Sequence, residues 1–305
     1  MTTNNSTYHT PVMLDECIEA LNIIPNGTYV DVTFGGGGHS KKIFEKLDSS
    51  GTLIAFDQDS EARKNAWESP NFKFIPANFS FLINHLKMIG VNQVDGILAD
   101  LGVSSFQFDK PERGFSIRSN ARLDMRMNQN AERTAEQVVN EYSEEELIKV
   151  FKSYGEFPKT NRLVTAIISA RENKRIKTTN DLVEIAEKLA PKHKEHKYYA
   201  QVFQAIRIEV NDEMGALKQL LTATADVLKP GGRLVVMSYH SLEDRLVKNY
   251  LKRGSFSGEV EKDFYGNVLK SFTEVERRPI IPAEDEVERN NRARSAKLRI
   301  GERNG

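Results

Sequence analysis

Short apolar runs and amphipathic stretches alternate along the first hundred residues of the chain. Runs rich in β-branched and aromatic residues lie at 29–34, 52–56, 72–75 and 94–100. Between them, apolar residues recur at helical spacing over 40–47, 60–67 and 81–89. Short buried runs are typical of strands, and the amphipathic stretches are typical of helices. The alternation predicts a parallel, doubly wound α/β sheet, with a ligand site at the carboxyl ends of its strands.

The alternation of predicted strands and helices ends near residue 110. The pattern then predicts consecutive helices, at 134–141, 144–153, 159–174 and 179–190. A long helical region over 198–227 follows, and an apolar strand at 233–238 resumes the sheet. We therefore expect a discontinuous α/β domain formed by residues 1–109 and 197–305, interrupted by a helical insertion at 110–196.

Four consecutive glycines, Gly35–Gly38, separate the first predicted strand from the first predicted helix. Glycine lets a backbone approach a ligand closely, and a helix start offers unpaired N–H groups. The spacing does not fit the dinucleotide fingerprint, because the third glycine counted from Gly35 would fall on Ser40. Asp57 lies about 20 residues further on, where a carboxylate can accept hydrogen bonds from ribose hydroxyls. The loop therefore favours S-adenosylmethionine (SAM) over NAD.

Further candidates follow other strands of the predicted sheet. Phe79 and Asp100 come after the third and fourth strands, so they should lie at the same edge as the glycine loop. An acidic group beside a cofactor pocket is a candidate for acid–base chemistry. His240 follows the strand at 233–238 and is a second polar candidate, with a structural histidine as the alternative. We predict Asp100 and His240 as catalytic candidates.

Composition limits the classes of function. The 305 residues include 43 basic and 43 acidic side chains, so a bulk electrostatic attraction to nucleic acid is not expected. Cys17 is the single cysteine and lies in the apolar face of a predicted short helix, which indicates a buried thiol in a reducing, cytosolic setting. With six scattered histidines, we expect no metal site. No apolar run reaches the roughly 18 residues of a membrane span, so we expect no membrane partner.

Nine stretches of the chain resemble the motifs of a known family. They are HTPVMLDE (9–16), DVTFGGGGHS (31–40), GILADLGVSS (96–105), ERGFS (112–116), LDMRMN (123–128), FQAIRIEVNDE (203–213), LKPGGRL (228–234), YHSLEDR (239–245) and RARSAKLR (292–299). Together they resemble the bacterial 16S rRNA (cytosine-N4)-methyltransferase family, also called RsmH or MraW. The resemblance implies a Rossmann-like class I SAM-dependent methyltransferase with a helical insertion that recognises substrate. It also implies methylation of the N4 amine of a decoding-centre (P-site) cytidine in the small (30S) ribosomal subunit.

The same resemblance implies a set of cofactor contacts. They fall on Gly37, Gly38, His39, Asp57, Phe79, Asp100 and Gln107. His39 and Gln107 rest on the resemblance alone, whereas the others also follow from their positions at strand ends.

The segment after the fourth strand departs from the pattern that amino-methyltransferases typically show there. They carry Asp/Asn-Pro-Pro-aromatic, whereas this chain has Asp100-Leu101-Gly102-Val103. Asp100 could therefore hold the methionine end of SAM instead of the amine. Other aromatic residues are then candidates to stack on a flipped-out base, namely Phe106, Phe108, Phe115 and Tyr239.

Predicted RNA contacts are basic residues in irregular and terminal segments. They are Arg113, Arg118, Arg122, Arg126, Arg292 and Arg294, with Lys297 beside the last two, and a solvated surface charge is the alternative for each. Three other functions stay open: methylation of DNA or protein amines, NAD-dependent redox chemistry, and RNA binding without catalysis. Carbon-5 methylation of pyrimidines is disfavoured, because it needs a cysteine nucleophile. The oligomeric state also stays open, a homodimer being one option.

Overall fold

The structure is a computed structural model that describes residues 11–305. The first two residues of the HTPVMLDE stretch lie outside these residues. The described chain divides into two compact units, one from the residues up to Gly102 together with Met214–Gly305, the other from Val103–Glu213. None of the helices in residues 11–305 combines the length and apolar composition that a membrane crossing requires.

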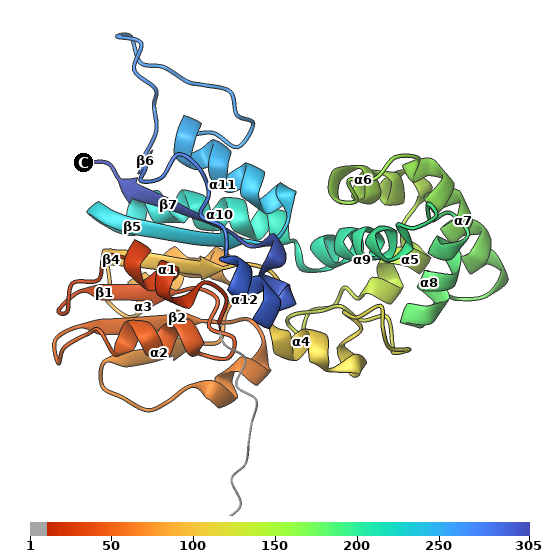
Figure 1. Cartoon of the computed structure of the whole chain (residues 1–305), viewed down its shortest axis with the longest axis horizontal. Helices are drawn as coiled ribbons and strands as arrows, with labels where there is room; N and C mark the ends of the chain where they lie inside the picture. The colour runs from red at the N-terminus through yellow and green to blue at the C-terminus, as the bar shows by residue number, and fades with distance from the viewer. Residues whose placement is uncertain (1–10) are drawn as a thin grey trace, which may run out of the picture. The chain divides into compact units, whose positions relative to one another are not determined.

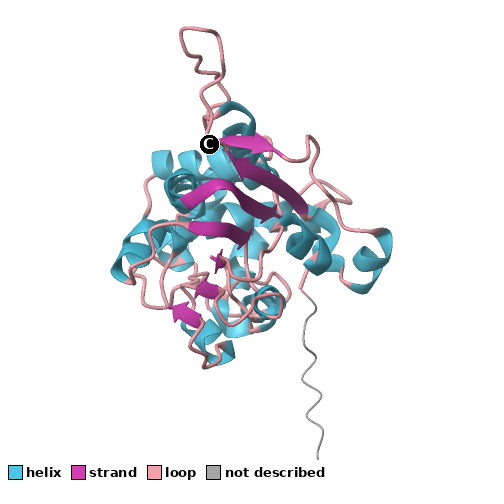
Figure 2. Cartoon of the chain, turned by 90° about the vertical axis from the view of Figure 1, so that its left-hand side faces the viewer, coloured by secondary structure: helices cyan, strands magenta, loops and turns pink. Residues whose placement is uncertain are grey.

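A seven-stranded sheet forms the centre of the described part of the first unit (Figures 1 and 2). Its strands are β1 (Thr28–Asp31), β2 (Thr52–Phe56), β3 (Phe72–Ile75), β4 (Val94–Asp100), β5 (Leu228–Ser238), β6 (Phe272–Glu274) and β7 (Lys297–Arg303). The order in the sheet is β3-β2-β1-β4-β5-β7-β6. The pairs among β1 to β5 are parallel, and β1 lies between β2 and β4, with Val30 opposite Ile54 and Ile97.

The strand order confirms the Rossmann-like class I architecture, with one departure from a wholly parallel sheet. β7 runs antiparallel to both of its neighbours, β5 and β6. Sequence order reverses at β1, from which the chain proceeds outward to β3 and then returns to β4 on the other side. In sheets of this kind, ligands bind in the crevice outside the carboxyl ends of the strands at that reversal.

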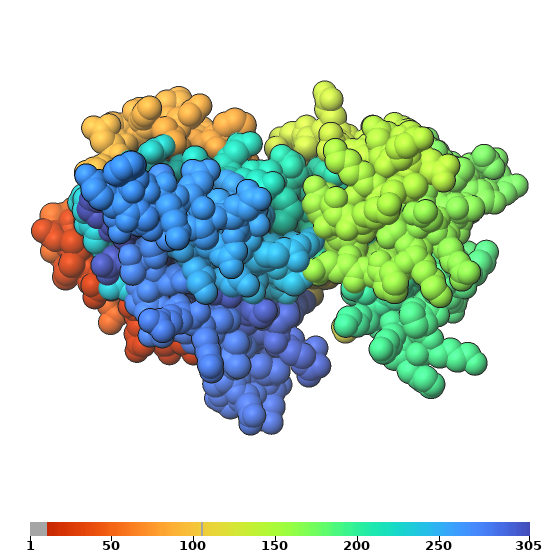
Figure 3. Space-filling model, turned by 90° about the horizontal axis from the view of Figure 1, so that it is seen from above, coloured from red at the N-terminus to blue at the C-terminus, as the bar shows by residue number. Residues whose placement is uncertain are grey.

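Helices cover both faces of this sheet because alternate strand residues point to opposite sides. They are α1 (Leu14–Ala20), α2 (Gly38–Phe44), α3 (Leu82–Met88), α10 (Glu213–Val227), α11 (Ser241–Arg253) and α12 (Glu284–Arg289). Val30 and Ile97 pack with α3, α10 and α11, whereas Tyr29 packs with α1 and α2 on the opposite face. Cys17 is fully buried in the second of these clusters, as predicted. The residues after β5 (blue) form much of the first unit's surface in Figure 3.

Helices build the second unit around one apolar cluster. They are α4 (Ser105–Asp109), α5 (Ala135–Glu141), α6 (Glu144–Tyr154), α7 (Thr160–Asn173), α8 (Thr179–Glu187) and α9 (Glu195–Asn211). The predicted capping box at the start of α6 is present, since Ser143 and Glu146 bond each other's backbone N–H groups. Capping boxes also begin α5 and α8.

The second unit is wider than the insertion predicted at 110–196. Its cluster includes Val202 and Ile206 of α9, so that helix belongs to the second unit. The predicted continuous helical region over 198–227 is also interrupted. Asp212 takes a left-handed conformation with φ of 46°, which ends α9 before α10 begins.

Candidate active site at the strand ends

Carboxylates lie at the carboxyl ends of three neighbouring strands of the first unit. Asp31 ends β1, Asp57 directly follows β2, and Asp100 ends β4. The Thr33 hydroxyl links two of these ends, because its oxygen accepts the backbone N–H of Asp100 at 2.6 Å and lies 3.4 Å from the Asp31 carboxylate. Asp57 and Asp100 therefore lie at strand ends, as predicted, and Asp31 joins them.

The glycine loop is packed so closely that side chains are excluded at two of its positions. Gly37 has a φ of +76°, and a Cβ atom there would lie 2.9 Å from the Phe34 ring. A Cβ atom on Gly38, the first residue of α2, would collide with the Pro11 ring. Gly36, in contrast, is exposed and has no atom within 4 Å of where its Cβ would be. The loop thus presents bare backbone at Gly36 for the close approach of a ligand.

Asp57 is tied to the loop. One of its carboxylate oxygens accepts the Gly35 N–H and the other accepts the Asp59 N–H, both at 2.8 Å. Burial raises the pKa of Asp57 to about 6, although these hydrogen bonds oppose the rise. Phe79 begins a short 3₁₀ helix after β3, and its half-buried ring packs against the apolar cluster beneath the sheet. Both residues therefore lie at strand ends, as predicted, and their contacts with a cofactor stay predictions.

The Asp100 carboxylate contacts two side chains at this edge. Its Oδ1 accepts a hydrogen bond from the Tyr239 hydroxyl at 2.8 Å, and its Oδ2 lies 3.8 Å from His39 Nδ1. Burial raises the pKa of Asp100 to about 6, and the nearby His39 opposes the rise. A quarter of the Asp100 side chain is nevertheless exposed, so a substrate group could reach it.

His39 is buried at the start of α2, with its tautomer constrained by Val12. Its Nε2 lies 3.1 Å from the Val12 carbonyl oxygen, which can only accept a hydrogen bond. Nε2 therefore carries a proton, and in the neutral ring Nδ1 turns an unprotonated nitrogen toward Asp100. His39 Nδ1 thus lies beside the Asp100 carboxyl, where the histidine opposes the rise in the Asp100 pKa.

Asp31 is a functional candidate that the sequence reasoning missed. It is fully buried and accepts hydrogen bonds from Ser40 Oγ at 2.6 Å and from the Thr33 N–H at 3.0 Å. Burial raises its pKa, although the Ser40 hydroxyl opposes the rise. The available signal was an acidic residue at the end of the strand that enters the glycine loop. Asp31 fixes the first turn of α2 against β1 and thereby positions the loop.

The His240 ring is held by its own helix. It precedes α11 as the N-cap, its Nδ1 accepts the Glu243 N–H at 3.4 Å, and its Nε2 lies 3.1 Å from Glu243 Oε1. Glu243 in turn accepts the Tyr239 N–H at 2.9 Å. The Nδ1 contact favours the structural interpretation of His240, although its buried Nε2 makes no hydrogen bond within the described residues.

Predicted residues in the second unit have local partners. Gln107 and Ser104 form the capping box of α4, with Gln107 Oε1 accepting the Ser104 N–H at 3.0 Å. Phe115 is buried in the apolar cluster, so it is not available to stack on a base. Phe106 and Phe108 are each 40% exposed and stay candidates for stacking. The contact of Gln107 with a cofactor stays a prediction.

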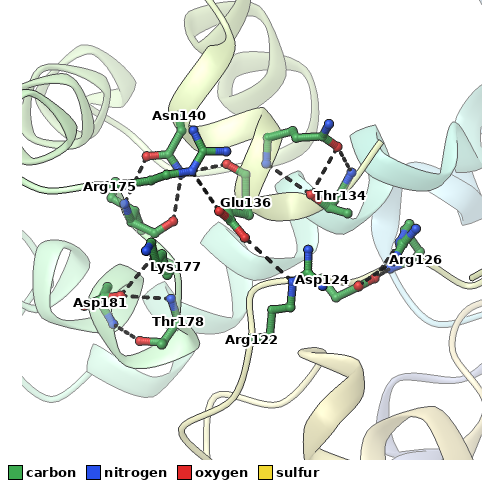
Figure 4. Close-up of polar contacts among 12 residues, drawn as sticks. Arg122, Asp124, Arg126, Thr134, Glu136, Asn140, Arg175, Lys177, Thr178 and Asp181 are labelled. Atoms are coloured by element: carbon green, nitrogen blue, oxygen red, sulfur yellow. Dashed lines mark hydrogen bonds and ion pairs between the residues drawn. The ribbon is translucent and has the colours of Figure 1, made fainter. Parts of the chain in front are cut away.

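The predicted RNA-binding arginines separate into buried and exposed groups. Arg126 forms a bidentate ion pair with Asp124, in which Nε and Nη2 each donate to a carboxylate oxygen at 2.8 Å (Figure 4). Arg113 is buried, and its Nη2 donates to the carbonyls of Arg126 and Met127. Both guanidinium groups are thus occupied inside the second unit, which argues against their prediction as RNA contacts.

The other predicted arginines are more accessible. Arg118 is exposed, and the Arg122 side chain is 65% exposed at 3.7 Å from Glu136 (Figure 4). Arg292 is half-buried and Arg294 is exposed, both in a 3₁₀ turn of the first unit that precedes β7.

Replacing Arg113 by alanine is expected to lower the free energy of unfolding by about 2–4 kcal/mol, because the buried carbonyls of Arg126 and Met127 would lose their donor. The matched change Arg118→Ala should alter it by less than about 0.5 kcal/mol, as expected for an exposed side chain. Urea denaturation of both variants measures the difference. Equal stabilities would contradict the structural role of Arg113.

Sequence comparisons relate the chain to a known protein family. The model of the MraW methylase family matches residues 6–304. The chain is 54% identical over 304 residues to the ribosomal RNA small subunit methyltransferase H of Parabacteroides distasonis, covering 99% of this chain and 100% of the relative. It is 55% identical over 298 residues to the protein of the same name from Cytophaga hutchinsonii, covering 97% and 99%. A solved rRNA methylase from Streptococcus thermophilus aligns with a TM-score of 0.41 at 13% identity, covering 96% of this chain and 94% of that one.

Proposed function

The chain belongs to the MraW methylase family, and from this premise we propose that it methylates the exocyclic N4 amine of a P-site cytidine in 16S rRNA. It is a SAM-dependent methyltransferase, and the shared name of its relatives supports rRNA of the small subunit as the substrate. The observation that carries the choice of an amine is the Asp100 carboxyl, which lies at the end of β4 on the sheet that also carries the glycine loop. Cys17, fully buried in the core, is not available for carbon-5 chemistry.

The residues at the strand ends fit SAM. Bare backbone at Gly36 allows close approach of the ligand, and Asp57 offers carboxylate oxygens for ribose hydroxyls. Phe79, after β3, would line the part of the SAM pocket that holds adenine. Gly37, Gly38 and His39 fix the conformation of the glycine loop. When bound, SAM supplies an electrophilic methyl group on a sulfonium.

The chemical problem is that the lone pair of a cytosine amine is delocalised into the ring. As the nitrogen forms its new bond to carbon, it becomes tetrahedral and its N–H proton becomes acidic. Asp100 can accept that proton, since a carboxyl with a pKa of about 6 is mostly ionised near pH 7. The Tyr239 hydroxyl holds Oδ1 in place, so the carboxylate needs no reorientation during the step.

SAM affinity is expected to rise with pH up to about 6 and then level off. The pKa of Asp57 in the free protein is about 6, and the ionised form is the better acceptor for ribose hydroxyls. Below that pH the binding energy must also remove a proton, which lowers the affinity by up to about tenfold per pH unit. Calorimetric titrations of wild type and Asp57→Asn across this range measure the effect. A variant that binds as tightly as wild type, with the same pH dependence, would remove Asp57 from the ribose site.

The proposed function is tested by methyl transfer from labelled SAM to purified small subunits that lack the modification. Nucleoside analysis of the product should give N4-methylcytidine, and DNA or protein amines should not compete. A product methylated at carbon 5 or on ribose would refute the assigned acceptor. No transfer despite measurable SAM binding would favour RNA binding without catalysis. Naked 16S rRNA in a parallel reaction tests whether the 30S particle is required.

We also propose that residues 110–196 recognise the rRNA. Arg118 and Arg122 are exposed cations that support this, whereas Arg113 and Arg126 form hydrogen bonds within the second unit. Each phosphate contact to single-stranded RNA contributes about −0.7 to the slope of log K against log salt. Removing either exposed arginine should therefore make the slope less steep by that amount, and an unchanged slope would argue against a phosphate contact.

A further inference from the structure

A cavity of about 420 Å³ opens in the first unit beside the carboxyl end of β5. One side is formed by Tyr239, His240 and Ser241, where β5 passes into α11. The opposite side includes Arg294, Ser295 and Lys297, in the segment that leads into β7. Two of the nine stretches noted in the sequence, 239–245 and 292–299, therefore meet at this cavity.

The cavity adjoins the proposed reaction centre through Tyr239. This side chain lines the cavity, while its hydroxyl donates the 2.8 Å hydrogen bond to Asp100. Burial, and next the nearby Asp100 charge, raise the pKa of Tyr239 well above its ordinary value, so the hydroxyl stays protonated and keeps donating. A molecule in the cavity would therefore contact the residue that orients the Asp100 carboxylate.

The walls combine apolar and cationic surface. Ile281, Pro282 and Val287 supply the apolar part. Among the described residues that line the cavity, none is acidic.

The cations around the cavity are incompletely neutralised. Asp244 forms ion pairs with two of them, because its carboxylate lies 3.2 Å from Lys297 Nζ and 2.6 Å from Arg299 Nε. Arg294 is exposed, and within residues 11–305 no carboxylate forms an ion pair with it. Arg294 therefore offers a positive charge at the cavity wall, while Glu286 and Glu288 flank Val287 on the apolar side.

We propose that this cavity binds a pyrimidine nucleotide of the rRNA substrate, with the base between Tyr239 and the apolar wall and the phosphate at Arg294 and Lys297. The inference rests on the proposed function and deepens it. The volume lies within the roughly 300–1,000 Å³ of small-molecule sites. Unstacked bases of RNA bind aromatic side chains, and arginine and lysine bind phosphates. No base pairing is possible in such a cavity, so the nucleotide must leave its stack to enter.

The first test compares two variants that reverse one charge. Arg294→Glu should raise KM for the small subunit by about tenfold or more, because it replaces an attraction to phosphate by a repulsion. Lys218→Glu, on an exposed face of α10 outside the cavity, is the matched control and should change KM much less. The Kd for SAM should stay within twofold of wild type in both. Equal KM values in the two variants would overturn the phosphate assignment.

The second test needs no turnover and so separates this inference from the proposed function. Cytidine 5′-monophosphate is mixed with the full chain and S-adenosylhomocysteine, and saturation-transfer NMR reports contacts to the base protons. Wild type should show transfer, Ser295→Trp should abolish it by filling the cavity, and Arg294→Glu should weaken it. The variants are accepted only if their Kd for S-adenosylhomocysteine matches wild type. No transfer to wild type at millimolar nucleotide, or transfer that survives in Ser295→Trp, would overturn the inference. Absence of N4-methylcytidine in the transfer assay would instead refute the proposed function.

Discussion

Replacement of Asp100 by asparagine is expected to lower kcat by about 10²–10⁴-fold, the usual contribution of a positioned general base. Asparagine keeps the size of the side chain and can still accept the Tyr239 hydrogen bond, but it cannot take the amine proton. In wild type, kcat should rise with pH through about 6, the pKa of Asp100, and the residual activity of the variant should lack this rise. Single-turnover assays with labelled SAM across this pH range measure both effects.

Asp95→Asn is the matched control for this experiment, because Asp95 lies at the opposite end of β4. Its carboxylate contacts Lys229 at 2.8 Å and the Thr28 N–H at 2.8 Å, away from the glycine loop. Its kcat should equal that of wild type. The measured Kd for SAM separates the two roles considered for Asp100. If Asp100→Asn weakens SAM binding and leaves kcat unchanged at saturation, the carboxylate holds the methionine end of SAM instead of accepting the proton.

Alanine at Gly37 is expected to weaken SAM binding by tenfold or more and to destabilise the fold by about 1–3 kcal/mol. The left-handed conformation at φ +76° alone costs a side chain about 1–2 kcal/mol. The new Cβ would also press on Phe34, whose ring packs against Trp67, Phe72 and Phe74 and has little room to move. Relief of the clash requires the loop to shift, and the loop backbone is what the cofactor approaches.

Gly36→Ala is the informative comparison, since the loop context and the chemical change are the same. Gly36 is not left-handed, and no atom of the described structure lies within 4 Å of the added Cβ. The thermal stability of the Gly36→Ala variant should therefore match that of wild type. Any loss of SAM affinity in this variant would show that SAM contacts the backbone at Gly36. Calorimetry and thermal unfolding of both variants decide the matter. Equal stability of the two alanine variants would show that the loop tolerates a shift at Gly37.

Local pattern predicted the elements of the sheet and part of the site. The strands at β2, β3 and β4 were readable because their β-branched and aromatic residues form short runs between turns. Asp57 and Asp100 followed from their positions after these strands. Cys17 followed from the apolar face of its helix. Each of these predictions depends on residues that are neighbours in sequence.

Long-range packing decided what the sequence could not. Nothing in residues 297–303 indicates that they pair antiparallel with β5, because strand order depends on contacts between distant segments. The burial of Arg113 depends on carbonyls 13 and 14 residues further along, so its sequence context resembles that of a surface cation. Asp31 was missed for a related reason, since its Ser40 and Thr33 partners are only meaningful once the glycine loop has folded over it.

The position of β7 has a consequence for the order in which the protein can form during translation. Residues 103–213 are continuous in the chain and can pack as soon as they leave the ribosome. The sheet of the first unit cannot, because β6 pairs with β7 and not with β5, and β7 comes after it. Until residue 303 has emerged, β5 presents an unpaired edge and Phe272 of β6 lacks its partner strand. Ribosome-stalled chains that stop before β7 should therefore be unable to bind SAM.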